Sequence, residues 1–246
     1  MKIIIADSYE EMSALAANKI LEKMETAGDP LLCLASGDTP TGLYKRLIRI
    51  QHKGNEAIRN WNFVGLDEWV GMNSEDPGSC GNYLEHEILQ PLKIANEKIC
   101  LFNGRAGDLS TECRRVKSFI EAHGGIDVAI LGLGSNGHLG LNEPGSDEDQ
   151  LVHVTELAES TRKVGQKYFS TSTELSRGIT LGLASIMKAK TVLLLVNGAH
   201  KAEILKQVVE GEPGNRVPGS LLQKHKNCYL FTEKTAASLL KPQIAQ

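Results

Sequence analysis

Two runs of the sequence are apolar at nearly every position, so a strand formed from either run would have no polar face. They are "IDVAILGLG", residues 126–134, and "KTVLLLVNG", residues 190–198. Such strands must be covered on both sides, as the strands of a parallel sheet are. Further strand-like runs are "KIIIA" from Lys2, "PLLCLAS" from Pro30, "WNFVGLDEW" from Trp61 and "NCYLFTE" from Asn227.

The segments between these runs have helical spacing. They are Glu10–Ala27, Thr39–Gln51, Gly81–Leu92 and Ala199–Gly211, and Pro40 lies near the start of the second, where a missing N–H costs least. Apolar strands that alternate with helices predict an α/β fold. We therefore expect an open, mostly parallel sheet with helices on both faces, and one domain over residues 1–246.

The composition excludes several classes of protein. The formal net charge is -3, so the chain lacks the basic field of a nucleic-acid-binding protein. No segment reaches the ~18 apolar residues that cross a bilayer, and the apolar stretch of "MKIIIADSYEEM" is too short for a secretory signal. The five cysteines contain no CxxC pair. We expect free thiols and a cytoplasmic protein that binds neither membrane nor nucleic acid.

Informative polar residues follow four of the predicted strands. In an open parallel sheet, ligands bind beyond the carboxyl ends of the strands. The residues there are Ser36–Pro40 after the second strand, Asp67 and Glu68 within "LDEW", the loop from Gly132 to Ser146, and Lys201 after the last long apolar run. We expect these four strand ends to meet in one crevice.

The loop "GLGSNGHLGLNEPGS", residues 132–146, contains one histidine and one glutamate among glycines. An imidazole titrates near ~6.5 and suits acid–base catalysis at neutral pH, and Glu143 could orient the ring of His138 through a hydrogen bond. A structural histidine in a tight turn is the alternative interpretation. A metal site is disfavoured, because no other histidine lies at ligand spacing.

The loop "SGDTP" enters a predicted helix and is a candidate anion site. Free N–H groups, the helix dipole and the hydroxyls of Ser36 and Thr39 favour phosphate, although a simple helix cap has the same pattern. Asp38 argues against phosphate, because its carboxylate repels an anion unless it points away.

Several of these motifs together resemble the glucosamine-6-phosphate deaminase (isomerase) family. The motifs come in the family's order from about Asp7 to about Cys228 and are "LDEW" (66–69), "GLGSNGHLGLNEPG" (132–145), "STR" (160–162), "RGITLGL" (177–183) and "NGAHKA" (197–202). Trp69, "RGITLGL" and the early "PGSC" (77–80) look similar to the galactosamine-6-phosphate branch of this family. The resemblance implies a modified Rossmann-type fold and conversion of a 2-amino-2-deoxy-hexose 6-phosphate into a ketohexose 6-phosphate plus ammonium, with no cofactor and no metal.

The resemblance also implies roles for individual residues. His138 opens the sugar ring, Asp67 moves the proton from C2 to C1, and Glu143 orients His138, while Asn136 stands where some relatives carry Asp. Phosphate is held by Ser36, Gly37, Thr39 and Lys201. Asp38 and Lys167 complete that predicted site but depart from the family's usual Gly and Arg, and a lysine lacks the bidentate fork of arginine.

Two other functions stay open at this point. A 6-phosphogluconolactonase-type hydrolase shares the fold and a histidine after a similar turn, but it would not need Asp67 and Glu143 in these contexts. A non-enzymatic sugar-phosphate-binding protein is the second, although such regulators usually carry a DNA-binding module, which is not evident before Pro30. Relatives occur as monomers and as hexamers, so a homo-oligomer is possible.

Overall fold

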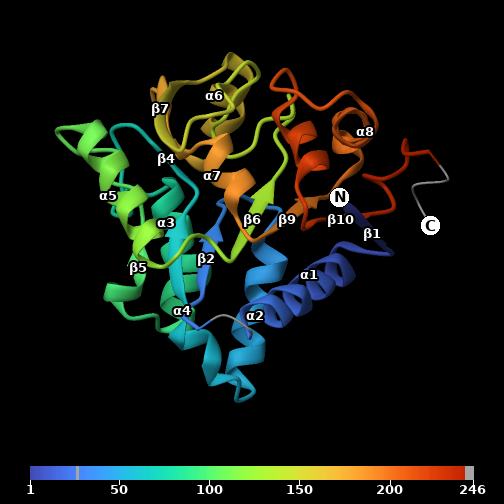
Figure 1. Ribbon diagram of the computed structural model, residues 1–246. Helices are drawn as coiled ribbons and strands as arrows, with labels where there is room; N and C mark the ends of the chain where they lie inside the picture. The colour runs from blue at the N-terminus through green and yellow to red at the C-terminus, as the bar shows by residue number, and fades with distance from the viewer. Residues whose placement is uncertain (26–27, 242–246) are drawn as a thin grey trace.

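A seven-stranded parallel sheet forms the centre of the computed structural model, which describes residues 1–25 and 28–241 (Figure 1). Its strand order is β1-β10-β9-β6-β2-β3-β5, and every neighbouring pair is parallel. The strands are β1 (Lys2–Ala6), β2 (Leu31–Leu34), β3 (Asn62–Gly65), β5 (Ile99–Cys100), β6 (Val128–Gly132), β9 (Thr191–Val196) and β10 (Cys228–Glu233). The predicted α/β class and mostly parallel sheet are confirmed.

Helices cover both faces of this sheet. α1 (Tyr9–Met24) and α2 (Thr41–His52) pack on one face, where side chains such as Ile20 and Leu47 share a core with Leu32 and Leu34 of β2. On the other face lie α5 (Leu109–Ala122), α7 (Leu183–Lys188) and α8 (Ala202–Glu210), whose buried side chains belong to the same core as Leu31 and Cys33. Successive residues of one strand therefore enter two separate cores, as the doubly apolar runs require.

Shorter elements complete the chain. The helical ones are η1 (Glu56–Asn60), α3 (Cys80–Leu84), the π-helical turn η2 (Glu85–Leu89), α4 (Gln90–Leu92), η3 (Asn96–Lys98), α6 (Glu159–Gly165), η4 (Gln166–Tyr168), η5 (Ala199–Lys201) and η6 (Pro218–Lys224). None of the helices in the described part of the chain is both long and apolar enough to cross a membrane.

A second, three-stranded sheet was not expected from the sequence. β4 (Asp67–Trp69), β8 (Arg177–Leu181) and β7 (Val152–Glu156) pair antiparallel in the order β4-β8-β7. The predicted strand "WNFVGLDEW" is therefore two strands in two sheets. Leu66 is the junction, because its N–H bonds to Leu34 in the main sheet and its carbonyl accepts from Leu181 in the second.

Two of the expected helices differ from the structure. The helix expected over Glu10–Ala27 ends at Met24, and residues 26 and 27 lie outside the described residues. The helix expected over Gly81–Leu92 is three consecutive elements, α3, η2 and α4, with the π-helical turn in the middle.

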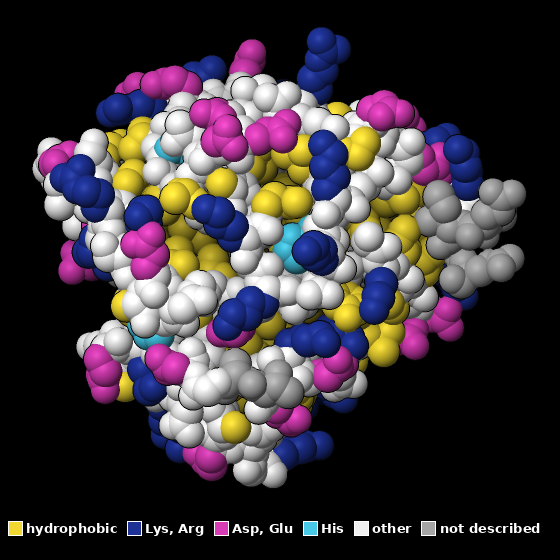
Figure 2. All heavy atoms as spheres, in the orientation of Figure 1, with side chains coloured by type: hydrophobic (Ala, Val, Ile, Leu, Met, Phe, Trp, Pro, Cys, Tyr) yellow, Lys and Arg dark blue, Asp and Glu magenta, His cyan; other side chains and the backbone are white. Residues whose placement is uncertain are grey.

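Surface charges of both signs are interspersed on the face shown in Figure 2. Several Lys and Arg side chains lie around a histidine near the middle of this face, Asp and Glu side chains lie mainly toward its edges, and hydrophobic side chains lie between them.

Candidate active site

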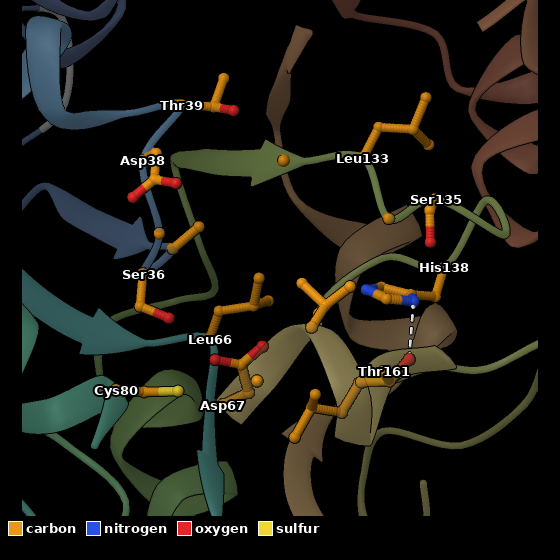
Figure 3. A pocket seen from close by; sticks show the side chains of 18 of the residues that line it. Ser36, Asp38, Thr39, Leu66, Asp67, Cys80, Leu133, Ser135, His138 and Thr161 are labelled. Atoms are coloured by element: carbon orange, nitrogen blue, oxygen red, sulfur yellow. Dashed lines mark hydrogen bonds between the residues drawn. The ribbon is translucent and has the colours of Figure 1, made fainter. Parts of the chain in front are cut away.

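A cavity of about 400 Å³ opens at the carboxyl ends of four neighbouring strands, β9, β6, β2 and β3. The chain proceeds from β2 outward to β3 on one side, and from β6 outward to β9 on the other, so the strand order reverses between β2 and β6. Such a reversal leaves a crevice where ligands bind in open α/β sheets. The loops that follow these strands line the cavity, with α6 and η4 beside them (Figure 3).

Asp67 begins β4, at the junction of the two sheets. Its carboxylate points into the cavity, toward the side from which His138 enters (Figure 3). Burial raises the pKa of Asp67 to about 6, while a hydrogen bond from the Cys80 thiol and the charge of His138 act against that rise. A Cβ at Gly140 would lie 3.3 Å from Oδ2 of Asp67, so glycine leaves room for this carboxylate.

Glu68 holds the surroundings of Asp67 in place. Its buried carboxylate accepts hydrogen bonds from the N–H groups of Trp69 (2.8 Å), Cys80 (3.0 Å) and Gly81 (2.8 Å). These bonds join β4 to the first turn of α3. The Glu68 carboxylate binds these backbone N–H groups, so Asp67 is the acidic group of "LDEW" that lines the cavity.

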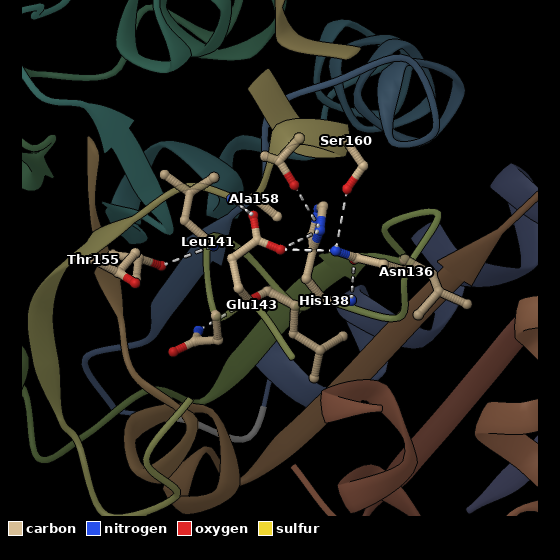
Figure 4. A network of polar contacts seen from close by, with 12 residues as sticks. Asn136, His138, Leu141, Glu143, Thr155, Ala158 and Ser160 are labelled. Atoms are coloured by element: carbon tan, nitrogen blue, oxygen red, sulfur yellow. Dashed lines mark hydrogen bonds and ion pairs between the residues drawn. The ribbon is translucent and has the colours of Figure 1, made fainter. Parts of the chain in front are cut away.

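His138 lies opposite Asp67 and belongs to a polar network (Figure 4). Its Nδ1 lies 3.6 Å from Oε2 of Glu143 and 3.3 Å from Oγ1 of Thr161. The Nδ2 of Asn136 donates to Oε2 of Glu143 at 2.8 Å, and Oδ1 of Asn136 accepts from the N–H of His138 at 3.2 Å. The other carboxylate oxygen of Glu143 accepts from the N–H of Ala158 at 3.2 Å.

The carboxylate of Glu143 is held ionised by these contacts. Burial alone would raise its pKa, but hydrogen bonds from His138 and Thr161 and the positive charge of His138 lower the pKa of Glu143 to about 2. An anionic partner on Nδ1 of His138 fixes the ring and leaves Nε2 for the ligand.

The loop after β2 has the features of an anion site. Among the described residues, the N–H groups of Gly37, Asp38 and Thr39 donate to no protein acceptor, and the loop leads into the N-terminus of α2. Tyrosine hydroxyls fix the loop from behind, since Tyr83 donates to the carbonyl of Gly37 at 2.7 Å and Tyr9 to that of Thr39 at 3.0 Å. The N–H groups are therefore fixed in position before any anion binds.

Two lysines reach the same end of the cavity. Lys201, at the end of η5, donates to the carbonyl of Leu133 at 2.7 Å, and burial together with the charge of Lys167 lowers the pKa of Lys201. Lys167, in η4, pairs with Asp38 across the mouth of the cavity, with 2.6 Å between Nζ and Oδ2.

All ten residues singled out from the sequence lie at or beside this cavity. Eight line it directly: Ser36, Gly37, Asp38, Thr39, Asp67, His138, Lys167 and Lys201. Asn136 and Glu143 lie behind His138. Thr161 and Cys80 were missed, although both lie in motifs quoted above, "STR" and "PGSC". Their positions in those motifs were the available signal, but contact with Nδ1 of His138 and with Asp67 follows only from the fold.

No group of three or more His, Cys, Asp or Glu side chains could hold a metal ion within residues 1–25 and 28–241.

Comparison with known proteins agrees with this architecture. A family model described as "Glucosamine-6-phosphate isomerases/6-phosphogluconolactonase" matches residues 6–231. A glucosamine-6-phosphate deaminase of Oceanobacillus iheyensis is 39% identical over 237 residues, which cover 96% of this chain and 95% of that protein. Glucosamine-6-phosphate deaminase 1 of Bacillus subtilis is 35% identical over 240 residues, covering 97% and 99%.

Solved structures support the same fold. A structure described as a monomeric glucosamine-6-phosphate deaminase superposes with a TM-score of 0.93 at 35% identity, covering 97% of this chain and 100% of the other. A 6-phosphogluconolactonase of Trypanosoma brucei superposes with a TM-score of 0.76 at 23% identity, covering 98% of each, which is a likeness of fold alone.

The fold and the cavity define an α/β protein with a ligand site at the switch point of its parallel sheet. The chain belongs to the family of glucosamine-6-phosphate isomerases and 6-phosphogluconolactonases.

Proposed function

We propose that this chain is an amino-sugar-6-phosphate deaminase and isomerase. It converts a 2-amino-2-deoxy-hexose 6-phosphate and one water molecule into a ketohexose 6-phosphate and ammonium. The observation that carries the proposal is the placement of two proton-transfer groups, Asp67 and His138, on opposite sides of one cavity whose far end has free N–H groups and lysines.

His138 serves the first step, opening of the pyranose ring. The proton of the C1 hydroxyl must leave while the ring oxygen gains one, and an imidazole can accept the first proton and supply the second. Glu143 and Thr161 hold Nδ1, so that Nε2 is the nitrogen that exchanges protons with the sugar. Asn136 is a positioning residue, because its side chain joins Glu143 to the backbone of His138.

Asp67 serves the second step. In the open aldehyde the C2–H bond is acidic, and Asp67 removes that proton to give an enolamine and returns it to C1, which leaves an imine at C2. Water adds to this carbon, the C–N bond breaks, and ammonium departs. A pKa raised to about 6 makes the Asp67 carboxylate a stronger base than an exposed aspartate and keeps it ionised at neutral pH.

The phosphate is held at the other end of the cavity. The free N–H groups of residues 37–39 and the hydroxyls of Ser36 and Thr39 surround its oxygens, and Lys201 and Lys167 supply positive charge. Asp38 contributes its N–H to this site, whereas its carboxylate faces Lys167.

The deciding experiment measures ammonium release from glucosamine 6-phosphate and from galactosamine 6-phosphate, beside hydrolysis of 6-phosphogluconolactone. The relatives named above are glucosamine-6-phosphate deaminases, whereas "LDEW" and "PGSC" look similar to the galactosamine branch, so both epimers are needed. We expect ammonium release and no lactone hydrolysis. Lactone hydrolysis without ammonium release would replace this proposal by the lactonase, and binding without turnover would replace it by a sugar-phosphate-binding protein.

Neither a cofactor nor a metal enters any of these steps, and a sugar phosphate is the only ligand that they require. Cytoplasmic location is part of the proposal and is supported by five cysteines that form no disulfide. The homo-oligomer stays a prediction; a solved relative is described as monomeric, and sedimentation velocity of the purified chain decides between the two states.

A further inference from the structure

One ion pair joins two segments of the cavity that are far apart in the sequence. Nζ of Lys167 lies 2.6 Å from Oδ2 of Asp38, 129 residues away. Asp38 belongs to the loop between β2 and α2, and Lys167 belongs to η4, which follows α6. Both residues line the cavity, so the pair closes part of its mouth.

The same two segments also touch beside this pair. A Cβ built on Gly37 would lie 3.3 Å from the hydroxyl of Tyr168, and the ammonium group of Lys167 stands 4.8 Å from the ring centroid of Tyr168. Residues 166–168 are therefore seated on the loop that has the free N–H groups. The Asp38–Lys167 pair lies directly at the proposed phosphate site.

The charges at this end of the cavity do not favour phosphate as strongly as two lysines would. The charge of Lys167 helps to lower the pKa of Lys201, so the two ammonium groups interact. The carboxylate of Asp38 neutralises the charge of Lys167. A sugar phosphate dianion that approaches Lys167 meets a carboxylate already bound to it. Like charges at this separation repel, and the lysine cannot give its full attraction to both anions.

We propose that Asp38 is an internal competitor of the substrate's phosphate for Lys167, and that it thereby sets the affinity of the enzyme for phosphorylated sugars. Before substrate binds, the pair fastens residues 166–168 to the phosphate loop. When substrate binds, a phosphate oxygen takes the place of the carboxylate on Nζ, and Asp38 turns toward solvent, to which its side chain is already 76% exposed. This inference rests on the phosphate site of the proposed function.

Other roles of Asp38 predict a different change in phosphate affinity when its charge is removed. If Asp38 instead positioned Lys167 for the phosphate, removal of its charge would weaken phosphate binding. If the Asp38–Lys167 pair had no part in phosphate binding, removal of the Asp38 charge would leave the phosphate affinity unchanged. The direction of one measured change therefore decides among the three.

The experiment compares Asp38→Asn, Lys167→Met and the double variant. Binding of inorganic phosphate is measured by calorimetry, and kcat/KM for glucosamine 6-phosphate is measured alongside. We expect Asp38→Asn to bind phosphate about three- to tenfold more tightly, from the freed lysine and the lost repulsion. We expect Lys167→Met to bind more weakly, and the second substitution Asp38→Asn to have a much smaller effect in that background. Unchanged or weaker binding in Asp38→Asn would overturn the inference.

A matched control exists on the same edge of the sheet. Asp7 pairs with Lys234 at 2.7 Å, and its side chain is 77% exposed, which is close to the 2.6 Å of the Asp38–Lys167 pair and to the 76% exposure of Asp38. Asp7→Asn removes the same charge away from the cavity, so phosphate binding should stay unchanged. If Asp7→Asn gained as much phosphate affinity as Asp38→Asn, the effect would come from the overall charge of the protein, and the inference would also be overturned.

Failure of the phosphate site itself has a separate signature. If Lys167→Met and Lys201→Met both leave phosphate affinity unchanged, the site assigned in the proposed function is wrong. If they weaken binding while Asp38→Asn does not strengthen it, the site stands and only the competition fails.

Discussion

Oε2 of Glu143 lies 3.6 Å from Nδ1 of His138, and Nδ2 of Asn136 donates to the same oxygen at 2.8 Å. One carboxylate oxygen thus serves the amide and the imidazole. Oδ1 of Asn136 also accepts from the backbone N–H of His138, so the Asn136 side chain ties Glu143 to the backbone of His138. The histidine in the glycine-rich loop is therefore placed by two residues of its own loop, together with Thr161 of α6, whose Oγ1 lies 3.3 Å from Nδ1.

His138→Gln should separate ring opening from the later steps. Glutamine keeps a polar side chain but cannot both accept and donate a proton near neutral pH. We expect turnover of the cyclic amino-sugar phosphate to fall at least about a hundredfold, with a much smaller loss for an acyclic analogue. Steady-state kinetics on the two substrates checks this. Equal damage on both would assign the imidazole to the C2 or imine step.

Glu143→Gln should act as a milder form of His138→Gln. The amide keeps the shape of the carboxylate but removes the charge that fixes and polarises the ring. We expect the cyclic substrate to be affected more than the acyclic one, by a smaller factor than in His138→Gln. The comparison uses the same pair of substrates. A loss larger than that of His138→Gln would give Glu143 a direct part in proton transfer.

Asp67→Asn should abolish proton exchange at C2. Asparagine has the same shape but cannot accept the proton, so isomerisation should fall at least about a hundredfold while substrate binding is retained. Incorporation of solvent deuterium at C2, followed by NMR, measures the step directly. Near-normal exchange in this variant would remove Asp67 from the mechanism.

The acidic limb of the pH profile should report Asp67. The base works only when ionised, and its pKa is raised to about 6, so kcat/KM should fall as the pH drops through about 6 rather than through about 4. The pKa of Glu143 is lowered to about 2, so Glu143 stays ionised over this range and adds no second limb. Burial raises the pKa of Glu68 to about 7, but its side chain accepts from backbone N–H groups and does not line the cavity.

A cysteine variant tests the same assignment. The Cys80 thiol stabilises the ionised form of Asp67, so Cys80→Ala should raise the pKa of Asp67 and move the acidic limb to higher pH. Cys228→Ala, which empties a buried position of β10, should leave the limb where it is. A limb that does not move in Cys80→Ala belongs to a group other than Asp67.

The main sheet could be predicted because its strands carry a strong signal. β6 and β9 are apolar at nearly every position, and both are buried on each face between helices. The site loops follow from the same signal, since parallel strands bring their carboxyl ends to one edge. Placement of Asp67 and His138 at one cavity therefore required only the strand order.

The second sheet could not be predicted in the same way. β4 has three residues, and β7 is only half-buried along its length, so neither shows a clear alternation of apolar and polar positions. The pairing of β4 with β8 depends on contacts between residues more than a hundred positions apart, such as Glu68 with Ile179. The Asp38–Lys167 pair has the same origin, because nothing local in the sequence joins the two residues.

Gly140→Ala should damage catalysis more than stability. At Gly140 a Cβ would lie 2.9 Å from Oγ1 of Thr180 and 3.3 Å from Oδ2 of Asp67, so the added methyl group must displace the carboxylate that we propose as the base or the strand behind it. Displacement by a fraction of an ångström misaligns the base with C2, and we expect kcat to fall at least about tenfold. The backbone φ of +58° adds a conformational cost of about 1 kcal/mol for alanine.

Gly145→Ala is the matched control, because its φ is +89° but a Cβ there meets no heavy atom within 4 Å. Thermal unfolding should show a lower melting temperature for both variants, whereas only Gly140→Ala should lose activity. Equal activity in the two variants would mean that the space beside Asp67 is not what the glycine at position 140 provides.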